Sequence, residues 1–111
     1  MKQAVDYMRA HLGEELNLEV LCGVFYMSKT DFVRKFIRDV GTPPIKYLRE
    51  MRITEACRLL REYTWLSVLD ISVSVGYHGT GNFNEAFRKQ VGMTPSAYRS
   101  ARFVVIEARR E

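Results

Sequence analysis

The stretch FVRKFIRDVGTPPIKY, residues 32–47, decides the fold, because it returns 51 residues later as FNEAFRKQVGMTPSAY, residues 83–98. The segments that precede each copy align better with an offset of 50, so the second copy has one extra residue in its turn. Within these two stretches six identities fall at the offset of 51, and they pair Phe32 with Phe83, Phe36 with Phe87, Val40 with Val91, Gly41 with Gly92, Pro44 with Pro95 and Tyr47 with Tyr98. The chain therefore contains two similar structural units.

The apolar residues recur at intervals of three and four throughout the chain, and no alternating strand pattern interrupts them. Gly and Pro residues separate the apolar runs. We therefore expect an all-α fold of seven helices, near Lys2–Leu12, Asn17–Phe25, Ser28–Gly41, Pro44–Glu62, Ser67–Gly76, Thr80–Gly92 and Pro95–Ala101. The stretch Phe103–Ile106 and the residues after it fit a helix extension, a loose strand or a frayed tail.

Each copy has the same order of parts, which is a short helix, a tight turn, a second helix and a glycine. This is the pattern of a helix-turn-helix motif, whose second helix can lie in the major groove of DNA. The plainer alternative is a pair of helical hairpins that share one packing solution. We divide the chain into a first lobe, a connecting helix, a second lobe and a tail, at residues 1–43, 44–62, 63–101 and 102–111. Trp65 follows the connecting helix, and we expect it to pack at the junction of the lobes.

The composition is that of a soluble globular chain, with 47% hydrophobic and 27% charged residues among 111. It excludes a disordered polyelectrolyte, a collagen-like repeat and a coiled-coil rod. No apolar run approaches the roughly 20 residues that span a bilayer, so we expect no membrane partner. The 17 basic and 13 acidic side chains give a net charge of +4, which permits an anionic partner without requiring one.

Catalytic and metal-binding patterns are not apparent in the sequence. Cys22 and Cys57 lie within apolar helical patterns, so we expect reduced core thiols in a cytoplasmic protein. A zinc site made of these thiols with His11 and His78 is the alternative, and we reject it because no pair has the close spacing of such ligands. Without a phosphate loop, metal cluster or activated nucleophile, we expect neither an enzyme nor a cofactor.

The segment 29–40 separates into two faces when it is drawn as a helix. Phe32, Phe36 and Val40 fall within about 80° of one another and predict a buried stripe. Thr30 and Arg34 lie on the opposite side, and Val33, Ile37 and Arg38 flank them. Apolar side chains beside an exposed polar face are not needed for solubility, but they suit contact with thymine methyl groups.

At this point the sequence resembles a known family, the AraC/XylS transcription regulators. Residues 21–36, with Leu21, Cys22, Phe25, Met27 and Ser28 before the two phenylalanines, are similar to the first helix-turn-helix of that family. Residues 71–99 closely resemble its C-terminal signature, and the likeness covers about residues 2–101. The resemblance implies a seven-helix DNA-binding domain with two homeodomain-like lobes joined by the long central helix.

The resemblance also implies which residues meet DNA. It places base-contacting residues of the first lobe at Thr30, Val33 and Arg34, with Arg34 on guanine as the strongest candidate. Lys29, Lys35 and Arg38 are better suited to phosphates, and Ser28 belongs to the same surface. The corresponding DNA-binding residues of the second lobe are Thr80, Gly81, Asn82, Asn84, Glu85 and Arg88.

The second lobe departs from the family at two of these positions. The family commonly has Arg where this chain has Glu85, and a longer polar residue where it has Gly81. Phosphates repel a carboxylate, although it can accept from cytosine N4. We therefore hypothesise that the first lobe supplies most base recognition and the second lobe mainly holds the backbone. The same departures favour the alternative function, a helical protein-interaction module that has kept the fold and lost base-specific DNA recognition.

The length of the connecting helix suits a single chain that binds two segments of DNA. About 19 residues span roughly 28 Å, whereas successive major-groove faces lie about 34 Å apart. We therefore expect one chain to place two recognition helices in adjacent groove segments of an asymmetric site. Double-stranded DNA is the expected partner, with RNA polymerase and a sensing domain as further candidates. Because no effector pocket is apparent, we favour a fragment of a longer regulator over a complete short one.

Overall fold

A computed structural model of the chain describes residues 1–101, and the regular secondary structure within these residues is helical throughout. The labelled helices are α1 (Lys2–Ala10), α2 (Leu18–Val24), α3 (Lys29–Val40), α4 (Pro44–Glu62), α5 (Val68–Ser74) and α6 (Gly81–Val91). Residues 95–101 form a seventh helical segment. The predicted all-α fold of seven helices is confirmed. The tail 102–111, for which the sequence left three alternatives, lies outside the described residues.

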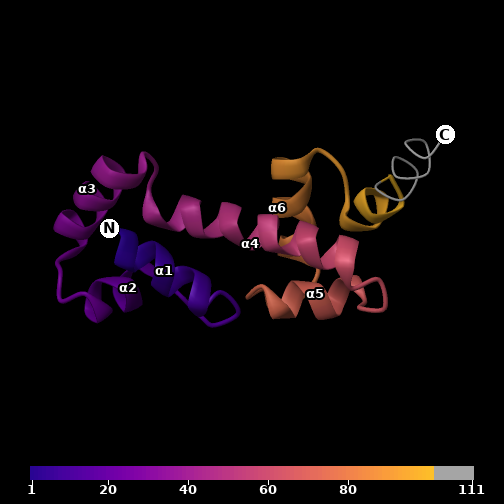
Figure 1. Cartoon of the computed structure of the whole chain (residues 1–111), viewed down its shortest axis with the longest axis horizontal. Coiled ribbons are helices and arrows are strands. Elements are labelled where there is room, and N and C mark those ends of the chain that lie inside the picture. Colours follow the sequence, from indigo (N-terminus) through magenta and orange to yellow (C-terminus); the bar gives the residue numbers. More distant parts are fainter. Residues whose placement is uncertain (102–111) are drawn as a thin grey trace. The chain divides into compact units, whose positions relative to one another are not determined.

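The first compact unit of the structure comprises Met1–Met51, which is the predicted first lobe together with the beginning of α4, and it contains α1, α2 and α3 (Figure 1). This unit is called the first lobe below. Each of these helices turns one apolar stripe inward, because burial of apolar surface is the main favourable term in folding. The residues that are buried in its core are Ala4, Met8, Leu21, Cys22, Phe32, Phe36 and Leu48.

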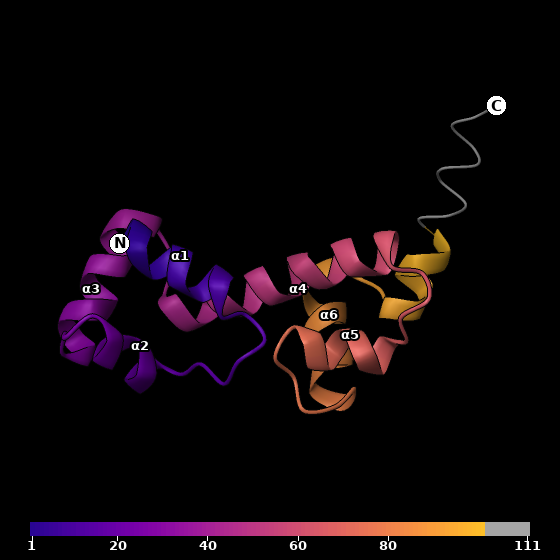
Figure 2. The same ribbon diagram turned by 60° about the horizontal axis from the view of Figure 1, so that its bottom comes forward.

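The second lobe extends from Arg52 and contains the rest of α4, with α5, α6 and the helical segment 95–101 (Figure 2). Its arrangement repeats that of the first lobe, because in both lobes a short helix and a longer one pack against α4. The residues buried in its core are Ile53, Ala56, Leu60, Ile71, Val75, Phe83 and Phe87.

Helix α4 belongs to both lobes, because the boundary between them falls inside it, after Met51. Its first half contributes Leu48 to the first core, and its second half contributes Ile53 and Leu60 to the second. The segment expected to be a connecting helix is therefore one continuous helix with a buried face in each lobe.

The internal repeat extends to the packing of the aromatic rings. Phe36 meets Tyr47 edge-on at a centroid distance of 5.7 Å and 66°. At the offset of 51, Phe87 meets Tyr98 at 5.6 Å and 69°. The glycines that end α3 and α6 also match, with φ of 92° at Gly41 and 93° at Gly92. The identities found in the sequence therefore lie at positions where the two lobes have the same packing or the same backbone conformation.

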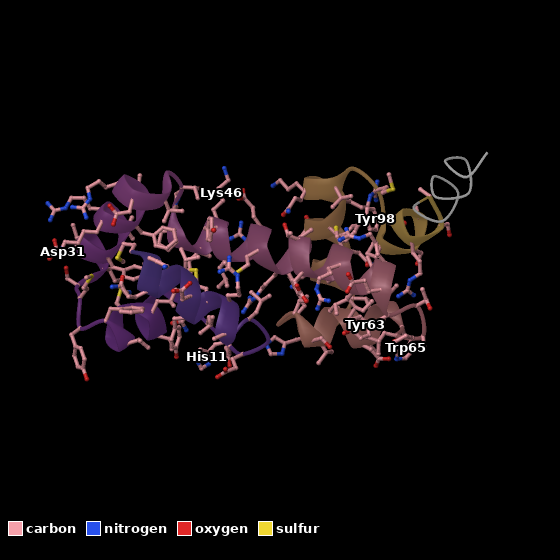
Figure 3. All side chains as sticks on the ribbon, in the orientation of Figure 1. His11, Asp31, Lys46, Tyr63, Trp65 and Tyr98 are labelled. Atoms are coloured by element: carbon pink, nitrogen blue, oxygen red, sulfur yellow. The ribbon has the colours of Figure 1, made fainter. Side chains whose placement is uncertain are left out.

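Two local expectations were wrong. The first helix ends at Ala10, not Leu12, and His11 caps it while its imidazole contacts the Glu14 carboxylate. Trp65 does not pack at the junction of the lobes, because 73% of it is exposed and its ring meets only the edge of Tyr63 among the described aromatic residues. Figure 3 shows the Trp65 side chain pointing outward from its lobe.

The two cysteines have different surroundings. Cys22 is buried in the first core, as expected. Cys57 is only half-buried, and that burial raises the pKa of its thiol. Both are free thiols.

Candidate nucleic-acid interface

The turns between α2 and α3 and between α5 and α6 are closed by the same type of backbone hydrogen bond. In the first lobe the Met27 N–H donates to the Cys22 carbonyl at 3.0 Å. In the second the Tyr77 N–H donates to the Ser72 carbonyl at 2.9 Å. A bond across five residues is the mark of a Schellman turn, which satisfies the last carbonyls of a helix. Both lobes thus contain the tight turn that the helix-turn-helix pattern predicts.

This type of turn needs one residue with positive φ, and the two lobes use different residues there. The second lobe has Gly76 with φ 100°, which costs glycine little. The first lobe has Tyr26 with φ 53°, in the left-handed region that costs a residue with a Cβ about 1–2 kcal/mol. The Tyr26 side chain is 97% exposed, so packing of the ring does not offset this strain.

Helix α3 begins with a well-formed cap and presents the predicted outward face. The Ser28 hydroxyl accepts from the Asp31 N–H at 3.2 Å, which satisfies one of the free donors of the first turn. Phe32 and Phe36 are fully buried, whereas Thr30 and Arg34 are exposed. Of the predicted first-lobe residues, Thr30 and Arg34 therefore lie on the side of α3 that faces away from the core.

The flanks of this outward face are partly apolar. Ile37 is 41% exposed and Val33 is half-buried, so both side chains border the polar centre of the helix. Lys35 is also half-buried, which places it nearer the edge than Arg34. The resulting surface combines hydrogen-bond donors with methyl groups, which are the two kinds of contact that base edges offer in the major groove.

Each of the three exposed basic residues predicted to meet DNA in the first lobe is paired with a carboxylate in this structure. The partners are Lys29 with Glu19 at 3.1 Å, Arg34 with Asp31 at 3.0 Å, and Arg38 with Asp39 at 2.8 Å. The Arg38 guanidinium, with help from the chain's amino terminus, holds the pKa of the Asp39 carboxyl well below its usual range. These exposed pairs have little effect on stability.

Helix α6 begins less firmly than α3. Thr80 stands at its N-cap with φ −91° and ψ −19°, and its side chain makes no capping hydrogen bond. Gly81 follows as the first helical residue; a Cβ built there would meet nothing within 4 Å, so packing does not require glycine at this position. Helix α6 therefore begins without a side-chain cap, and its first residue has no side chain.

Most of the predicted residues of the second lobe line one shallow groove along α6. Its lining residues are Gly81, Asn84, Glu85, Arg88, Lys89 and Gly92. The spacing of three and four residues places them on one helix face, opposite the buried Phe83 and Phe87. Asn82 lies instead in a second depression, beside the turn residues Gly76–Gly79.

The Asn84 amide has an unusual environment in this groove. Its Oδ1 atom is buried, and it has no hydrogen-bond partner within the part of the chain that is described. A buried acceptor without a partner is costly. A donor brought by a bound molecule would relieve this cost.

Sequence reasoning missed Asp31 and left Lys89 out of the residues assigned to DNA binding. No role in DNA binding was predicted for Asp31, although its spacing of three from Arg34 is a signal for a helical ion pair. Figure 3 shows Asp31 at the outer surface of α3. Lys89 lines the α6 groove next to Arg88, and both belong to the last turn of that helix.

Neither a metal cluster nor a membrane span is found in residues 1–101. No group of three or more His, Cys, Asp or Glu side chains in this part could hold a metal ion. No helix of the described chain is long and apolar enough to cross a membrane.

Two helix pairs with matching turns, each ending in a longer helix with an outward face that carries polar side chains, define the class of double helix-turn-helix domains. A family model described as a helix-turn-helix domain matches residues 21–101. The chain therefore belongs to this family, the helix-turn-helix domains of the AraC type.

Curated relatives show the same family and a greater length. The MmsAB operon regulatory protein of Pseudomonas aeruginosa is 38% identical over 93 residues, which cover 84% of this chain and 30% of that protein. The transcriptional activator RhaS of an Enterobacter species is 29% identical over 102 residues, which cover 92% of this chain and 36% of that protein. The chain spans about a third of the length of such relatives.

Solved structures match nearly the whole described fold. The DNA-binding domain of the transcriptional factor AdpA, in complex with a target DNA, gives a TM-score of 0.86 at 32% identity, covering 90% of this chain and 89% of that one. An AraC-type transcriptional regulator from Chromobacterium violaceum gives 0.81 at 29% identity, covering 91% and 89%. The fold assignment thus rests on matches along the length of both lobes.

Proposed function

We propose that this chain is the part of a transcription regulator that binds double-stranded DNA in a sequence-specific manner. The observation that carries the proposal is the outward face of α3, where the exposed Arg34 lies beside the apolar side chains of Val33 and Ile37, above a core of buried phenylalanines. In α6 the buried phenylalanines return, while the outward face carries Asn84, Glu85 and Arg88. The chain's likeness to a domain that was solved on its target DNA supports the same conclusion.

Two recognition helices in one chain predict an asymmetric site. The outward side chains of α3 and α6 differ at nearly every matched position, so the two helices would prefer different bases. We propose that they enter adjacent segments of the major groove, with Ser28, Lys29, Thr30, Val33, Arg34 and Arg38 from the first lobe and Thr80, Gly81, Asn82, Asn84, Glu85 and Arg88 from the second. Selection of perfectly palindromic sites would contradict this proposal.

The two lobes would share the work unequally. Arg34 can donate two hydrogen bonds to guanine O6 and N7, a contact worth about 1–3 kcal/mol of discrimination. Glu85 occupies the corresponding position of α6 and is repelled by phosphates. Arg88 and Lys89 lie one turn further along α6, where they can neutralise phosphates. The first lobe would therefore select the sequence, and the second lobe would hold the duplex.

Selection from a random pool of DNA duplexes at 50 and 200 mM salt tests the proposal. We expect one asymmetric motif to be enriched, with the guanine contact in one half. If about four phosphates are neutralised, affinity should fall roughly a hundredfold between these salt concentrations. Retention of the fold with no enriched motif would favour the alternative, a helical module that binds protein.

The further partners of the whole regulator follow from the same proposal. A chain that binds the chromosome would act in the cytoplasm. RNA polymerase and a sensing domain in the remainder of the regulator are the additional partners that the family resemblance implies. Binding of purified RNA polymerase to the chain on its selected DNA would test the first of these.

A further inference from the structure

The ion pair between Asp31 and Arg34 lies at the centre of the outward face of α3. The Arg34 Nη2 atom donates to Asp31 Oδ1 at 3.0 Å, and the two side chains are 71% and 51% exposed. Their spacing of three residues puts both groups on one side of the helix. A carboxylate therefore stands beside the arginine that is the strongest candidate for contact with guanine.

The position of this carboxylate is not explained by helix capping. Helix α5 has an aspartate at the same distance from its cap, three residues after Ser67. The carboxylate of this residue, Asp70, accepts from the Ser67 N–H at 3.3 Å, which completes a capping box. In α3 the Ser28 hydroxyl accepts from the Asp31 N–H, but the Asp31 carboxylate accepts from the Arg34 guanidinium. Two similar sequences, SKTD and SVLD, thus use their aspartates for different purposes.

The chemistry of the pair suits recognition of two neighbouring bases. A guanidinium has five N–H donors, so it can donate two to guanine and one to a carboxylate at the same time. The carboxylate limits the rotation of a long side chain, and less conformational entropy is then lost on binding. Its second oxygen can accept from an amino group in the major groove, such as cytosine N4.

We propose that Asp31 is a specificity-determining residue of the DNA-binding surface, which positions Arg34 on guanine and accepts from the amino group of a neighbouring base. This inference rests on the proposed function. It goes beyond that function because it gives Asp31 a role in base recognition, whereas a carboxylate that only repelled phosphates would weaken binding. If Asp31 merely repelled DNA, its removal would strengthen binding to every sequence by the same factor.

The substitution Asp31→Ala, with Glu19→Ala as the matched control, separates positioning from repulsion. Glu19 is also exposed and also pairs with a basic residue of the α3 first turn, Lys29 at 3.1 Å. Each variant removes one negative charge near the same end of the helix. Binding of each is measured on the selected site, on the site with its guanine replaced, on the site with the neighbouring base replaced, and on unrelated DNA.

We expect both variants to bind unrelated DNA a few times more tightly than the parent chain. Only Asp31→Ala should lose discrimination, about tenfold at the guanine and to a similar degree at the neighbouring base. Asp31→Glu keeps a carboxylate within reach of Arg34 and should recover part of the lost preference. Thermal unfolding of all variants checks that the lobe remains folded.

Equal behaviour of Asp31→Ala and Glu19→Ala on all four duplexes would overturn the inference and leave the proposed function intact. A parent chain that selects no sequence would overturn both. Loss of discrimination with Asp31→Ala, together with recovery in Asp31→Glu, would establish Asp31 as a positioning residue.

Discussion

The two lobes agree in their cores and differ on their surfaces. The phenylalanine pairs of α3 and α6 are equally buried, and the rings that pack against them have nearly the same geometry. By contrast, α3 carries four basic and two acidic residues, whereas α6 carries two basic and one acidic. Packing restricts what a core position accepts, while the outward positions are free to change with the ligand.

The start of each recognition helix shows the same contrast. Ser28 caps α3 through its hydroxyl, but Thr80 makes no side-chain cap for α6. The first lobe tolerates a strained Tyr26 in its turn, whereas the second has Gly76 there. The comparison indicates that each lobe keeps the helix-turn-helix geometry by different local means.

The core equivalence can be tested with Phe36→Ala and Phe87→Ala. Both side chains are fully buried, so each substitution should lower the free energy of unfolding by about 3–5 kcal/mol. Urea denaturation followed by circular dichroism measures the loss. Ile37→Ala is the control within α3, because its 41% exposed side chain should contribute much less. A small loss in one lobe beside a large loss in the other would show that the two cores are not equivalent.

The difference in base recognition can be tested with Arg34→Ala and Glu85→Ala on the selected site. Loss of a bidentate guanine contact should reduce discrimination by about 1–3 kcal/mol, or roughly 5- to 150-fold. Glu85→Ala should leave the order of preferred bases unchanged and strengthen binding slightly, because a charge that repels phosphates is removed.

Arg9→Ala controls for the loss of one exposed positive charge outside the motifs, since Arg9 lies on α1 and is 64% exposed. Fluorescence anisotropy on matched and substituted duplexes gives the ratios. If Glu85→Ala abolished specificity while Arg34→Ala preserved it, the division of work between the lobes would be reversed.

The smallest effects should come from the two turns, and they should have opposite signs. Tyr26→Gly removes left-handed strain of about 1–2 kcal/mol. The glycine also gives the unfolded chain more conformational entropy, which lowers stability by about 0.5–1 kcal/mol. The free energy of unfolding should therefore rise by about 0.5 kcal/mol. Gly76→Ala places a Cβ at φ 100° and should cost about 1 kcal/mol or more. Thermal unfolding should show shifts of a few degrees in opposite directions. Shifts of the same sign would mean that the turns are not equivalent.

The fold could be predicted closely because its signals are local and repeated. Helix α4 runs from Pro44 to Glu62, as expected, since a proline suits the first turn of a helix. Phe83 and Phe87 are buried as their spacing predicts. Trp65 was misplaced because the short loop around it has no periodicity from which its direction could follow.

The candidate site could be predicted only in part. Helical spacing placed Thr30 and Arg34 outward without any tertiary information. The pair of Lys29 with Glu19 depends on how α2 packs against α3, which no spacing in the sequence reports. The pair of Asp31 with Arg34 follows a spacing of three, but the same aspartate also fits a capping sequence, and only the structure distinguishes these uses.

The division of α4 between the lobes has a consequence for attempts to separate them. The lobe boundary follows Met51 in the middle of a continuous 19-residue helix, not in a loop. A cut there would leave each half of α4 as a stub of eight to eleven residues with four newly unsatisfied backbone groups at the break. Gene fragments that encode one lobe should therefore keep all of α4, and recombination between relatives should tolerate exchanges in the flanking turns better than in this helix.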